Sequence, residues 1–339
     1  MTKSVWVKNV QIGGGAPISV QSMTDTLTSD FDATMNRIFE LYNAGCDLVR
    51  LSIPDEYSVK TLKRIVQESP LPIIADIHYD YRLALKSIEA GVHKLRVNPG
   101  NLKKEGLKEV ARIASERNIP IRVGVNKGSQ SDRLTPSQLA SLCVDTARLM
   151  EDNGTDKLVL AVKSSSVKET VEAYRELSKL TDYPLHVGLT EAGTDKMGVT
   201  KSNIAIGSLL LDGIGDTIRV SLTASSVREV IEGRKILRAV GLEKNYVEIV
   251  ACPTCARTAI QVEKYASELE RLTENYHKPL KIAVMGCTVN GIGESKGADF
   301  GVCGGKDKSA IIKNGEIIKT IPNDKILDEL VKMVEESND

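Results

Sequence analysis

The stretch ATMNRIFELYNAGCDLVRLSI, residues 33–53, contains the unit from which most of this chain is built. In its first part, Ile38 and Leu41 share one face at helical spacing, which is typical of an amphipathic helix. Its second part, DLVRLSI, is a short and nearly continuous apolar run, as in a strand buried on both faces. The stretch therefore predicts a helix that leads into a strand of a parallel sheet.

The same alternation extends in both directions from this stretch. Further runs of the same kind, in chain order, are PISVQSM, PIIADI, HKLRVN, PIRVGV, KLVLAV, PLHVGLT and DTIRVSLT, and segments with helical spacing such as SVKETVEAYRELSKL separate them. Eight such units over about 240 residues fit a (β/α)8 barrel of the TIM type, an α/β fold whose usual length is about 250 residues. An open doubly wound sheet is the alternative, but no glycine-rich dinucleotide turn follows the first strand.

The chain is too long for this barrel alone. Its 339 residues exceed the roughly 250–300 at which a single core usually stops growing. The pattern changes near Gly241, where NYVEIVACPTC begins a second unit with a possible Asn314–Gly315 hairpin turn and a closing helix in KILDELVKMVEES. We therefore expect a barrel domain over residues 1–240 and a small α/β domain over residues 241–339.

Composition narrows the functional class. A formal net charge of zero gives no bulk attraction to nucleic acid or membranes, and 4% aromatic residues are too few for a base-stacking surface. No apolar stretch approaches the ~20 residues that span a bilayer, and the N-terminus lacks the apolar segment of a signal peptide. We expect a reducing, cytoplasmic location, where the six cysteines are more often ligands, reactive thiols or core residues than disulfides.

Three cysteines of the second domain indicate a metal centre. Cys252 and Cys255 are expected in a turn that opens a helix, and Cys287 follows a neighbouring strand. Three thiolates favour zinc or an iron–sulfur cluster, although a redox dithiol is a further alternative. Structural zinc prefers four closed ligands, and the nearest histidine, His277, lies in a separate turn.

The fourth ligand position raises a choice between two residues. In a [4Fe–4S] cluster bound by three cysteines, the carboxylate of Glu294 is a harder and more weakly held ligand that substrate can displace. Cys303 is the rival, but its surroundings in GVCGG are those of a small core residue.

Cations on five predicted strands indicate an anion-binding site. Since chemistry in TIM barrels lies at the carboxyl ends of the strands, these side chains should converge there. They are Arg50, Arg96, Arg122, Lys163 and Arg219. Clustered buried cations need an anion between them, and a polyphosphate suits the bidentate guanidinium groups. Lys201 and Ser202 are expected at a helix start that adds a further anion site.

One carboxylate stands out at this end of the barrel. Glu191 follows the seventh strand, where it is either an acid/base group or a counter-charge to an arginine. Asp76 and Asn126 also lie at strand ends, but the sequence favours a catalytic role for them less than for Glu191. His78 and His186 are expected to be structural.

Motifs spread along the whole chain resemble one enzyme family. They are VQSMTDT, GCDLVRLSIPD, ADIHYDYRLAL, KLRVNPGN, PIRVGVNKGS, TEAGT, GIGDTIRVSLT, CPTCART and GCTVNGIGES. In this order they resemble the 4-hydroxy-3-methylbut-2-enyl diphosphate synthases in their bacterial two-domain form. The resemblance implies reductive ring opening and dehydration of 2-C-methyl-D-erythritol 2,4-cyclodiphosphate in the methylerythritol phosphate route to isoprenoids.

The resemblance also implies roles for individual residues. Cys252, Cys255, Cys287 and Glu294 would bind a [4Fe–4S] cluster, and Glu191 would be the acid/base residue. Substrate contacts would come from Arg50, Arg96, Arg122, Lys163, Lys201, Ser202, Arg219 and Ser221, with Asn290 beside the cluster. Electrons would come from ferredoxin or flavodoxin, the second domain would be similar to a sulfite-reductase domain, and the enzyme would be a homodimer.

Two other functions are compatible with the residues alone. One is a different iron–sulfur dehydratase acting on a phosphorylated substrate. The other is a binding module stabilised by zinc and fused to an inactive barrel. A brown protein would favour a cluster, whereas a colourless protein with bound zinc would favour the binding module.

Overall fold

The computed structural model describes residues 1–129 and 134–337, without the side chain of Asn290. The chain divides into two compact units. The barrel unit is Met1–Leu242 and the C-terminal unit is Glu243–Asp339. Each unit has its own apolar core.

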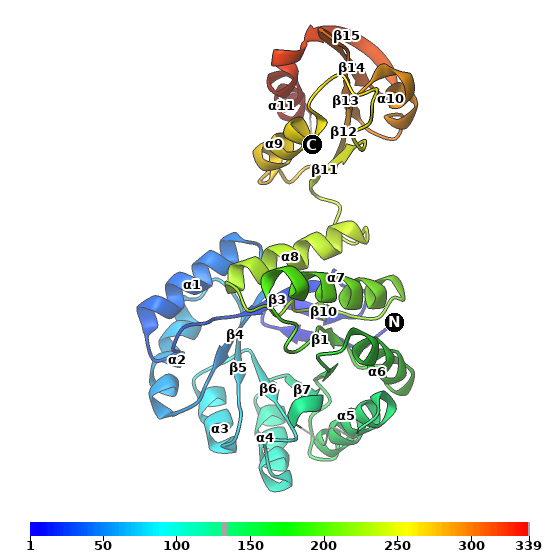
Figure 1. The fold of residues 1–339 in the computed structure, drawn as a ribbon. Coiled ribbons are helices and arrows are strands. Elements are labelled where there is room, and N and C mark those ends of the chain that lie inside the picture. Colours follow the sequence, from blue (N-terminus) through cyan, green and yellow to red (C-terminus); the bar gives the residue numbers. More distant parts are fainter. Residues whose placement is uncertain (130–133, 338–339) are drawn as a thin grey trace. The chain divides into compact units, whose positions relative to one another are not determined.

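Eight described strands of the barrel unit form one parallel sheet, surrounded by helices (Figure 1). The strands are β3 (Ser19–Met23), β4 (Leu48–Ser52), β5 (Ile73–Asp76), β6 (Lys94–Val97), β7 (Ile121–Asn126), β8 (Leu158–Lys163), β9 (His186–Val187) and β10 (Thr217–Ile218). The helices are α1 (Phe31–Asn43), α2 (Glu56–Glu68), α3 (Tyr81–Glu89), α4 (Lys104–Glu116), α5 (Pro136–Glu151), α6 (Val167–Leu180), α7 (Asp195–Leu211) and α8 (Ser226–Ala239), with a 3-10 turn η1 at Lys127–Ser129.

The sheet closes on itself. Its strands follow the order β8-β7-β6-β5-β4-β3-β10-β9, and a parallel bridge from Leu160 of β8 to Leu185 joins the two ends. The backbone N–H of Leu160 donates to the Pro184 carbonyl at 2.9 Å. The prediction of a TIM-type barrel is therefore confirmed.

An N-terminal hairpin, which the sequence did not predict, covers one end of the barrel. It consists of β1 (Ser4–Val7) and β2 (Val10–Gly13). Its side chains Val5, Val7 and Ile12 form an apolar cluster with Leu48, Ile74 and Val159 of the barrel strands. Leu48 and Val159 lie at the amino ends of their strands, so the hairpin forms an apolar floor opposite the carboxyl ends.

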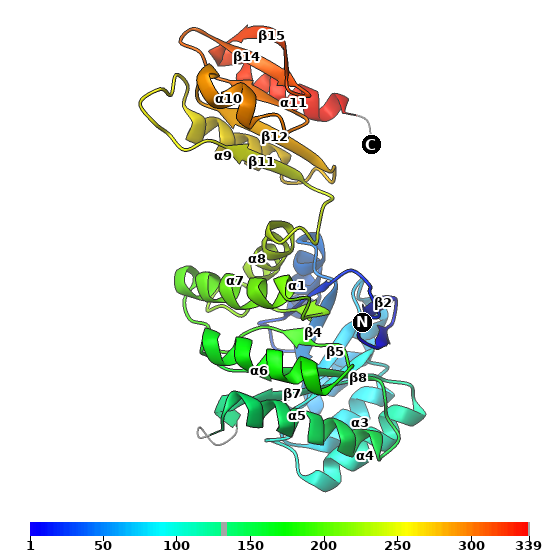
Figure 2. The ribbon, with the colours of Figure 1, turned by 90° about the vertical axis from the view of Figure 1, so that its right-hand side faces the viewer.

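The C-terminal unit is an α/β domain with a five-stranded sheet over its described residues (Figure 2). Its strands are β11 (Val247–Ala251), β12 (Leu280–Met285), β13 (Phe300–Cys303), β14 (Lys308–Lys313) and β15 (Glu316–Pro322). Its helices are α9 (Val262–Thr273), α10 (Thr288–Glu294) and α11 (Ile326–Glu336), with a 3-10 turn η2 at Asn323–Lys325.

The sheet of this unit changes direction along its order. β11, β12 and β13 are parallel, whereas β14 and β15 are antiparallel to their neighbours. Lys313 pairs with Glu316 across Asn314 and Gly315, which both have positive φ as a two-residue hairpin turn requires. The predicted Asn–Gly hairpin is thus confirmed.

Membrane insertion finds no support in the helices. Among the described residues, none of the helices combines the length and the apolar character that crossing a bilayer requires.

Candidate functional site

Five cations face the interior of the barrel. Arg50, Arg96 and Arg122 lie within β4, β6 and β7, Lys163 ends β8, and Arg219 follows β10. Their neighbours along each strand, such as Leu51 and Val97, pack into the core shared with the helices, so strand alternation turns the cations into the barrel interior. All but Arg219, which is half-buried, are buried. The five cations therefore share one interior, but the expectation that all of them lie at the carboxyl ends of their strands is wrong for Arg122, the second residue of β7.

Asp76 is the counter-charge to two of these cations. Its carboxylate accepts from Arg96 Nη1 at 3.0 Å and forms an ion pair with Arg50, whose Nε lies 3.2 Å away. Burial opposes ionisation of this carboxyl, but Arg50 and Arg96 outweigh it and lower its pKa to about 2. Asp76 therefore holds two guanidinium groups in place and remains ionised in doing so.

A second counter-charge, Glu229 of α8, escaped the sequence analysis. Its carboxylate accepts from Arg219 Nη2 at 3.2 Å, from Ser22 Oγ at 3.1 Å and from the backbone N–H of Leu222 at 2.9 Å. The signal was present in the sequence, because Glu229 lies beside Val230 on the buried face of α8. Glu229 thus fixes Arg219 as Asp76 fixes Arg50.

Among the described residues, no carboxylate forms an ion pair with Arg122 or Lys163, in contrast to the other three cations. Of the described buried side chains, Arg122 is among those with unpartnered atoms, here Nε and Nη1. Burial, followed by the charges of neighbouring arginines, lowers the pKa of Arg122 and that of Lys163 well below their usual values. Two buried cations that repel their neighbours and lack an acceptor favour an anion in the space between them.

Two glycines keep this space open. A Cβ on Gly124 of β7 would lie 3.5 Å from Arg96 Nε and 3.7 Å from Arg122 Nη2. A Cβ on Gly188 would lie only 2.9 Å from Lys163 Nζ. Glycine at both positions therefore leaves room around the charged groups.

Glu191 lies at the mouth of the barrel in an unusual backbone conformation. Its side chain is exposed, and its φ of 52° is in the left-handed region that few non-glycine residues adopt. A Cβ on Gly128, just after β7, would lie 3.8 Å from Glu191 Oε1. The loop after β9 thus brings this carboxylate next to the end of β7.

The remaining predicted substrate contacts occupy different positions. Lys201 and Ser202 lie about two turns into α7, because this helix begins at Asp195, so the prediction that they open a helix is wrong. Ser202 is buried, whereas Lys201 and Ser221 are half-buried. Asn290 lies outside the residues whose side chains are described.

In the C-terminal unit, two neighbouring strands bring Cys252 and Cys287 to one edge of the sheet. Cys252 follows β11, and its backbone N–H donates to the Val284 carbonyl of β12 at 3.3 Å. The Gly286 N–H in turn donates to Cys252 Sγ at 3.1 Å, immediately before Cys287. Cys287 is the N-cap of α10, whose last residue is Glu294.

Cys255 lies in an exposed loop and not at a helix start. The sequence predicted that a helix begins here, but α9 begins only at Val262, and Figure 2 shows the intervening loop. The loop is held by the Ala259 N–H, which donates to the Gly286 carbonyl at 2.8 Å. A hydrogen bond from the Arg257 backbone, and not a helix dipole, lowers the pKa of the Cys255 thiol.

Cys303 has the properties of a core residue. It is fully buried at the end of β13. Burial, helped by the neighbouring Cys287, Cys252 and Glu294, raises the pKa of its thiol to about 11. A thiol that remains protonated is a poor metal ligand.

The thiols fit a cluster better than a single ion. Over the described residues, no three His, Cys, Asp or Glu side chains are close enough to hold one metal ion. A cluster tolerates wider spacing, since each of its ligands binds a different iron. The observed donor set of Cys252, Cys255 and Cys287, with thiolates favoured by backbone N–H groups, suits soft iron–sulfur chemistry.

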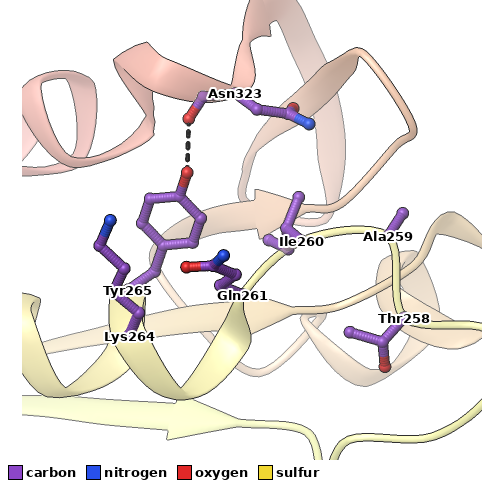
Figure 3. A pocket seen from close by; sticks show the side chains of 7 residues that line it. All are labelled: Thr258, Ala259, Ile260, Gln261, Lys264, Tyr265 and Asn323. Atoms are coloured by element: carbon purple, nitrogen blue, oxygen red, sulfur yellow. Dashed lines mark hydrogen bonds between the residues drawn. The ribbon is translucent and has the colours of Figure 1, made fainter.

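A pocket of about 450 Å³ lies beside the Cys255 loop (Figure 3). It is lined by Thr258, Ala259, Ile260, Gln261, Lys264, Tyr265 and Asn323. Thr258 Oγ1 accepts from the Cys255 N–H at 3.0 Å, and the Tyr265 hydroxyl donates to the Asn323 carbonyl at 2.8 Å. Lys264 is the single charged residue among these seven, so this pocket does not match a diphosphate as the barrel cations do.

Comparison with known families matches both units. The family described as "GcpE TIM-barrel domain" matches residues 2–234, and "GcpE protein C-terminal domain" matches residues 248–336.

Curated relatives span nearly the whole chain. A protein of Caldanaerobacter subterraneus subsp. tengcongensis is 48% identical, covering 99% of this chain and 97% of its own length. One of Clostridium acetobutylicum is 46% identical with 98% of each covered, and one of Thermotoga maritima is 48% identical with 97% and 96% covered. Each is named 4-hydroxy-3-methylbut-2-en-1-yl diphosphate synthase (flavodoxin).

Two solved structures share the fold of about 71% of this chain. The dihydropteroate synthase of Yersinia pestis has a TM-score of 0.55 at 14% identity and covers 71% of this chain and 98% of its own. That of Xanthomonas albilineans has a TM-score of 0.53 at 14% identity and covers 71% and 99%. At this identity the likeness shows the barrel fold and nothing of the reaction.

Proposed function

The chain belongs to the GcpE family, and from this premise we propose which of its residues bind substrate, hold the cofactor and transfer a proton. Like its relatives, it is an oxidoreductase that reduces 2-C-methyl-D-erythritol 2,4-cyclodiphosphate to 4-hydroxy-3-methylbut-2-enyl diphosphate in the methylerythritol phosphate pathway. It is an iron–sulfur protein with flavodoxin as electron donor, and we add ferredoxin as a possible alternative donor. This membership sets aside the zinc-stabilised binding module.

The diphosphate of the substrate binds among the barrel cations. The observation that carries this proposal is the pair of buried cations without a counter-charge, Arg122 and Lys163. Arg50, Arg96 and Arg219 are already oriented by Asp76 and Glu229, so they meet the phosphates with little reorganisation. Lys201, Ser202 and Ser221 extend this site, and Asn290 contacts substrate on the side of the cofactor.

We expect Arg122→Ala and Lys163→Ala each to weaken binding of the cyclodiphosphate about ten- to a hundredfold, since a charge-assisted hydrogen bond contributes roughly 1.5–3 kcal/mol. Calorimetry with the oxidised enzyme, without electron donor, measures this directly. The control is Arg148→Ala, which removes an exposed cation of α5 paired with Asp145. Unchanged affinity in both site variants would show that these cations only balance charge.

Cys252, Cys255 and Cys287 hold a [4Fe–4S] cluster, with Glu294 as the fourth ligand. When bound, the cluster supplies electrons to the substrate one at a time. The Gly286 N–H donates to Cys252 Sγ, and a hydrogen bond from the Arg257 backbone lowers the pKa of the Cys255 thiol. Glu294 is exposed at the end of α10, where a carboxylate is free to exchange. Thiolate ligands need reducing surroundings, which supports a cytoplasmic location.

Glu191 is the acid/base residue of the barrel. Its carboxylate is exposed at the barrel mouth, near the end of β7, and not paired with an arginine in any described contact. The left-handed backbone that presents it costs free energy, and such strain is typical of functional positions. A carboxylate that only balances charge is expected to be buried and paired with an arginine, as Asp76 and Glu229 are, and over the described residues Glu191 is neither.

The enzyme acts as a homodimer in which the barrel of one subunit works with the cluster domain of the other. The chemistry supports this, because one substrate needs the cations of a barrel unit and the electrons of a C-terminal unit. These functions lie in separate compact units of the chain. A closed two-fold dimer would contain two such composite sites.

Mixing two inactive variants tests this assembly. Glu191→Gln disables the barrel and Cys287→Ser the cluster domain, so exchanged subunits form heterodimers with one intact composite site. We expect about a quarter of wild-type activity from a statistical mixture of closed dimers. As a control, Cys252→Ser is mixed with Cys287→Ser. Both variants lack a functional cluster domain, so this mixture stays inactive. An inactive first mixture, despite confirmed subunit exchange, would place both functions within one chain.

A further inference from the structure

Lys94 is a buried cation that the proposed site does not use. It begins β6, two residues before Arg96, and its side chain is fully buried. Because Leu95 and Val97 pack outward against the helices, Lys94 points into the barrel as Arg96 does. It pairs in register with Ile74, a member of the apolar floor. Its backbone therefore lies nearer the amino end of β6 than that of Arg96.

The surroundings of Lys94 disfavour an ammonium group. Within the described part of the chain its Nζ has no hydrogen-bond partner. Burial, followed by the charges of Arg122 and Arg50, lowers its pKa well below the usual value. An unpaired ammonium in such a place costs several kcal/mol, and a buried lysine generally avoids this cost by losing its proton.

Eight other charged or titratable groups among the described residues face the same interior. They are Arg50 of β4, Asp76 of β5, Arg96 of β6, Arg122 of β7, Lys163 of β8, His186 of β9, Arg219 after β10 and Glu229 of α8. The cations outnumber the two carboxylates in this group. An empty barrel thus carries excess positive charge, which Lys94, with no exposed surface, relieves by remaining neutral, whereas Lys163 keeps 7% of its surface exposed.

We propose that Lys94 takes up a proton when the cyclic diphosphate binds, and so completes the positive charge of the site from beneath. The proposal rests on the proposed binding of the diphosphate by Arg122 and Lys163. Phosphate oxygens at Arg122 offset the nearest of the charges that repel a proton on Lys94. Lys94 does not touch the substrate in this scheme, and it acts through the field of Arg122.

The sign of the pH effect follows from linkage. Substrate raises the pKa of Lys94, so binding takes up a proton at pH values between the lower pKa of the empty barrel and the higher one of the complex. Affinity therefore falls as pH rises through this window, by at most about tenfold per pH unit for one proton. The substrate does not contribute, since each phosphorus of a cyclic diphosphate has a single, strongly acidic hydroxyl that is already ionised in this pH range.

The test is calorimetry of substrate binding to the oxidised holoenzyme without electron donor, between about pH 6 and about pH 9, a range below the usual lysine pKa of about 10.4. Comparing buffers of different ionisation enthalpy counts the protons. We expect wild type to take up close to one proton at the middle of the window, and Lys94→Met to take up none, with affinity independent of pH.

A matched control separates Lys94 from its titratable neighbour His186. Both ring nitrogens of His186 are unpartnered within the described residues, and burial followed by Arg122, Lys163 and Lys94 lowers its pKa. We expect His186→Gln to retain the proton uptake. Uptake that survives in Lys94→Met, or that disappears in His186→Gln alone, overturns the proposal.

Three further outcomes are also decisive. Lys94→Gln is a second neutral variant. A residue that is neutral in the empty barrel must tolerate a neutral replacement, so the proposal fails if neither Lys94→Gln nor Lys94→Met folds. Substrate binding by wild type without proton uptake refutes the role of Lys94 alone. Absent binding, or binding unaffected by Arg122→Ala and Lys163→Ala, refutes the underlying diphosphate site and the Lys94 proposal with it.

Discussion

The Cys287→Ser variant is expected to lose its iron–sulfur cluster and all measurable turnover. Serine is close in size, so the fold of the C-terminal unit, whose core consists of other side chains, remains. An alkoxide is a hard ligand that competes poorly for iron beside soft sulfide. Iron and acid-labile sulfide content, together with absorbance near 400 nm after anaerobic purification, measures the loss.

Cys303→Ala is the matched control for this prediction. Its thiol is buried in the same unit, near Cys287 and Cys252, but a pKa of about 11 keeps it protonated. We expect this variant to keep four irons per chain and an unchanged spectrum, as a [4Fe–4S] cluster requires. A Cys287→Ser protein that retains a full cluster, or a Cys303→Ala protein that loses it, would reassign the ligand set.

The Glu191→Gln variant is expected to bind substrate almost normally and to turn it over about 10²–10⁴ times more slowly, the usual contribution of a general acid or base. Glutamine has the same shape and adopts the same left-handed backbone at φ 52°, so position is preserved and only proton transfer is removed. Anaerobic turnover with a chemical reductant gives the rate constant, and calorimetry gives the affinity.

Glu172→Gln provides the reference for this variant. Glu172 is a carboxylate of α6 that forms a distant pair with Lys168 on the helix surface. It should leave both rate and affinity unchanged. Turnover of Glu191→Gln within twofold of wild type would remove the acid/base role, whereas a loss of affinity with normal turnover would make Glu191 a binding residue.

The barrel was predictable because its strands have a strong and repeated signal. Runs such as DLVRLSI and KLVLAV contain β4 and β8, and burial on both faces makes them apolar throughout. The N-terminal hairpin was not predictable in this way. Its strands have four residues each, and they become buried only through contacts with residues as distant as Val159.

The candidate site was predictable where a charged residue interrupts the apolar run of a buried strand. A cation in an apolar strand, such as Arg122, departs from the pattern and marks the barrel interior. Glu229 was missed because it comes from a helix, where a carboxylate is ordinary. The start of α9 was placed too early because the loop after Cys255 has good helix formers, while the hydrogen bond from Ala259 to Gly286 holds it extended.

The hairpin also has a consequence for folding during protein synthesis. Residues 4–13 leave the ribosome before the barrel strands that they contact, and a lone two-stranded hairpin is only marginally stable in water. Its apolar partners arrive with Leu48, Ile74 and finally Val159. The hairpin must therefore wait until the middle of the chain has been synthesised before it becomes buried. If translation pauses before β8, the apolar side chains of Val5, Val7 and Ile12 stay exposed. A chaperone of nascent chains would then bind them.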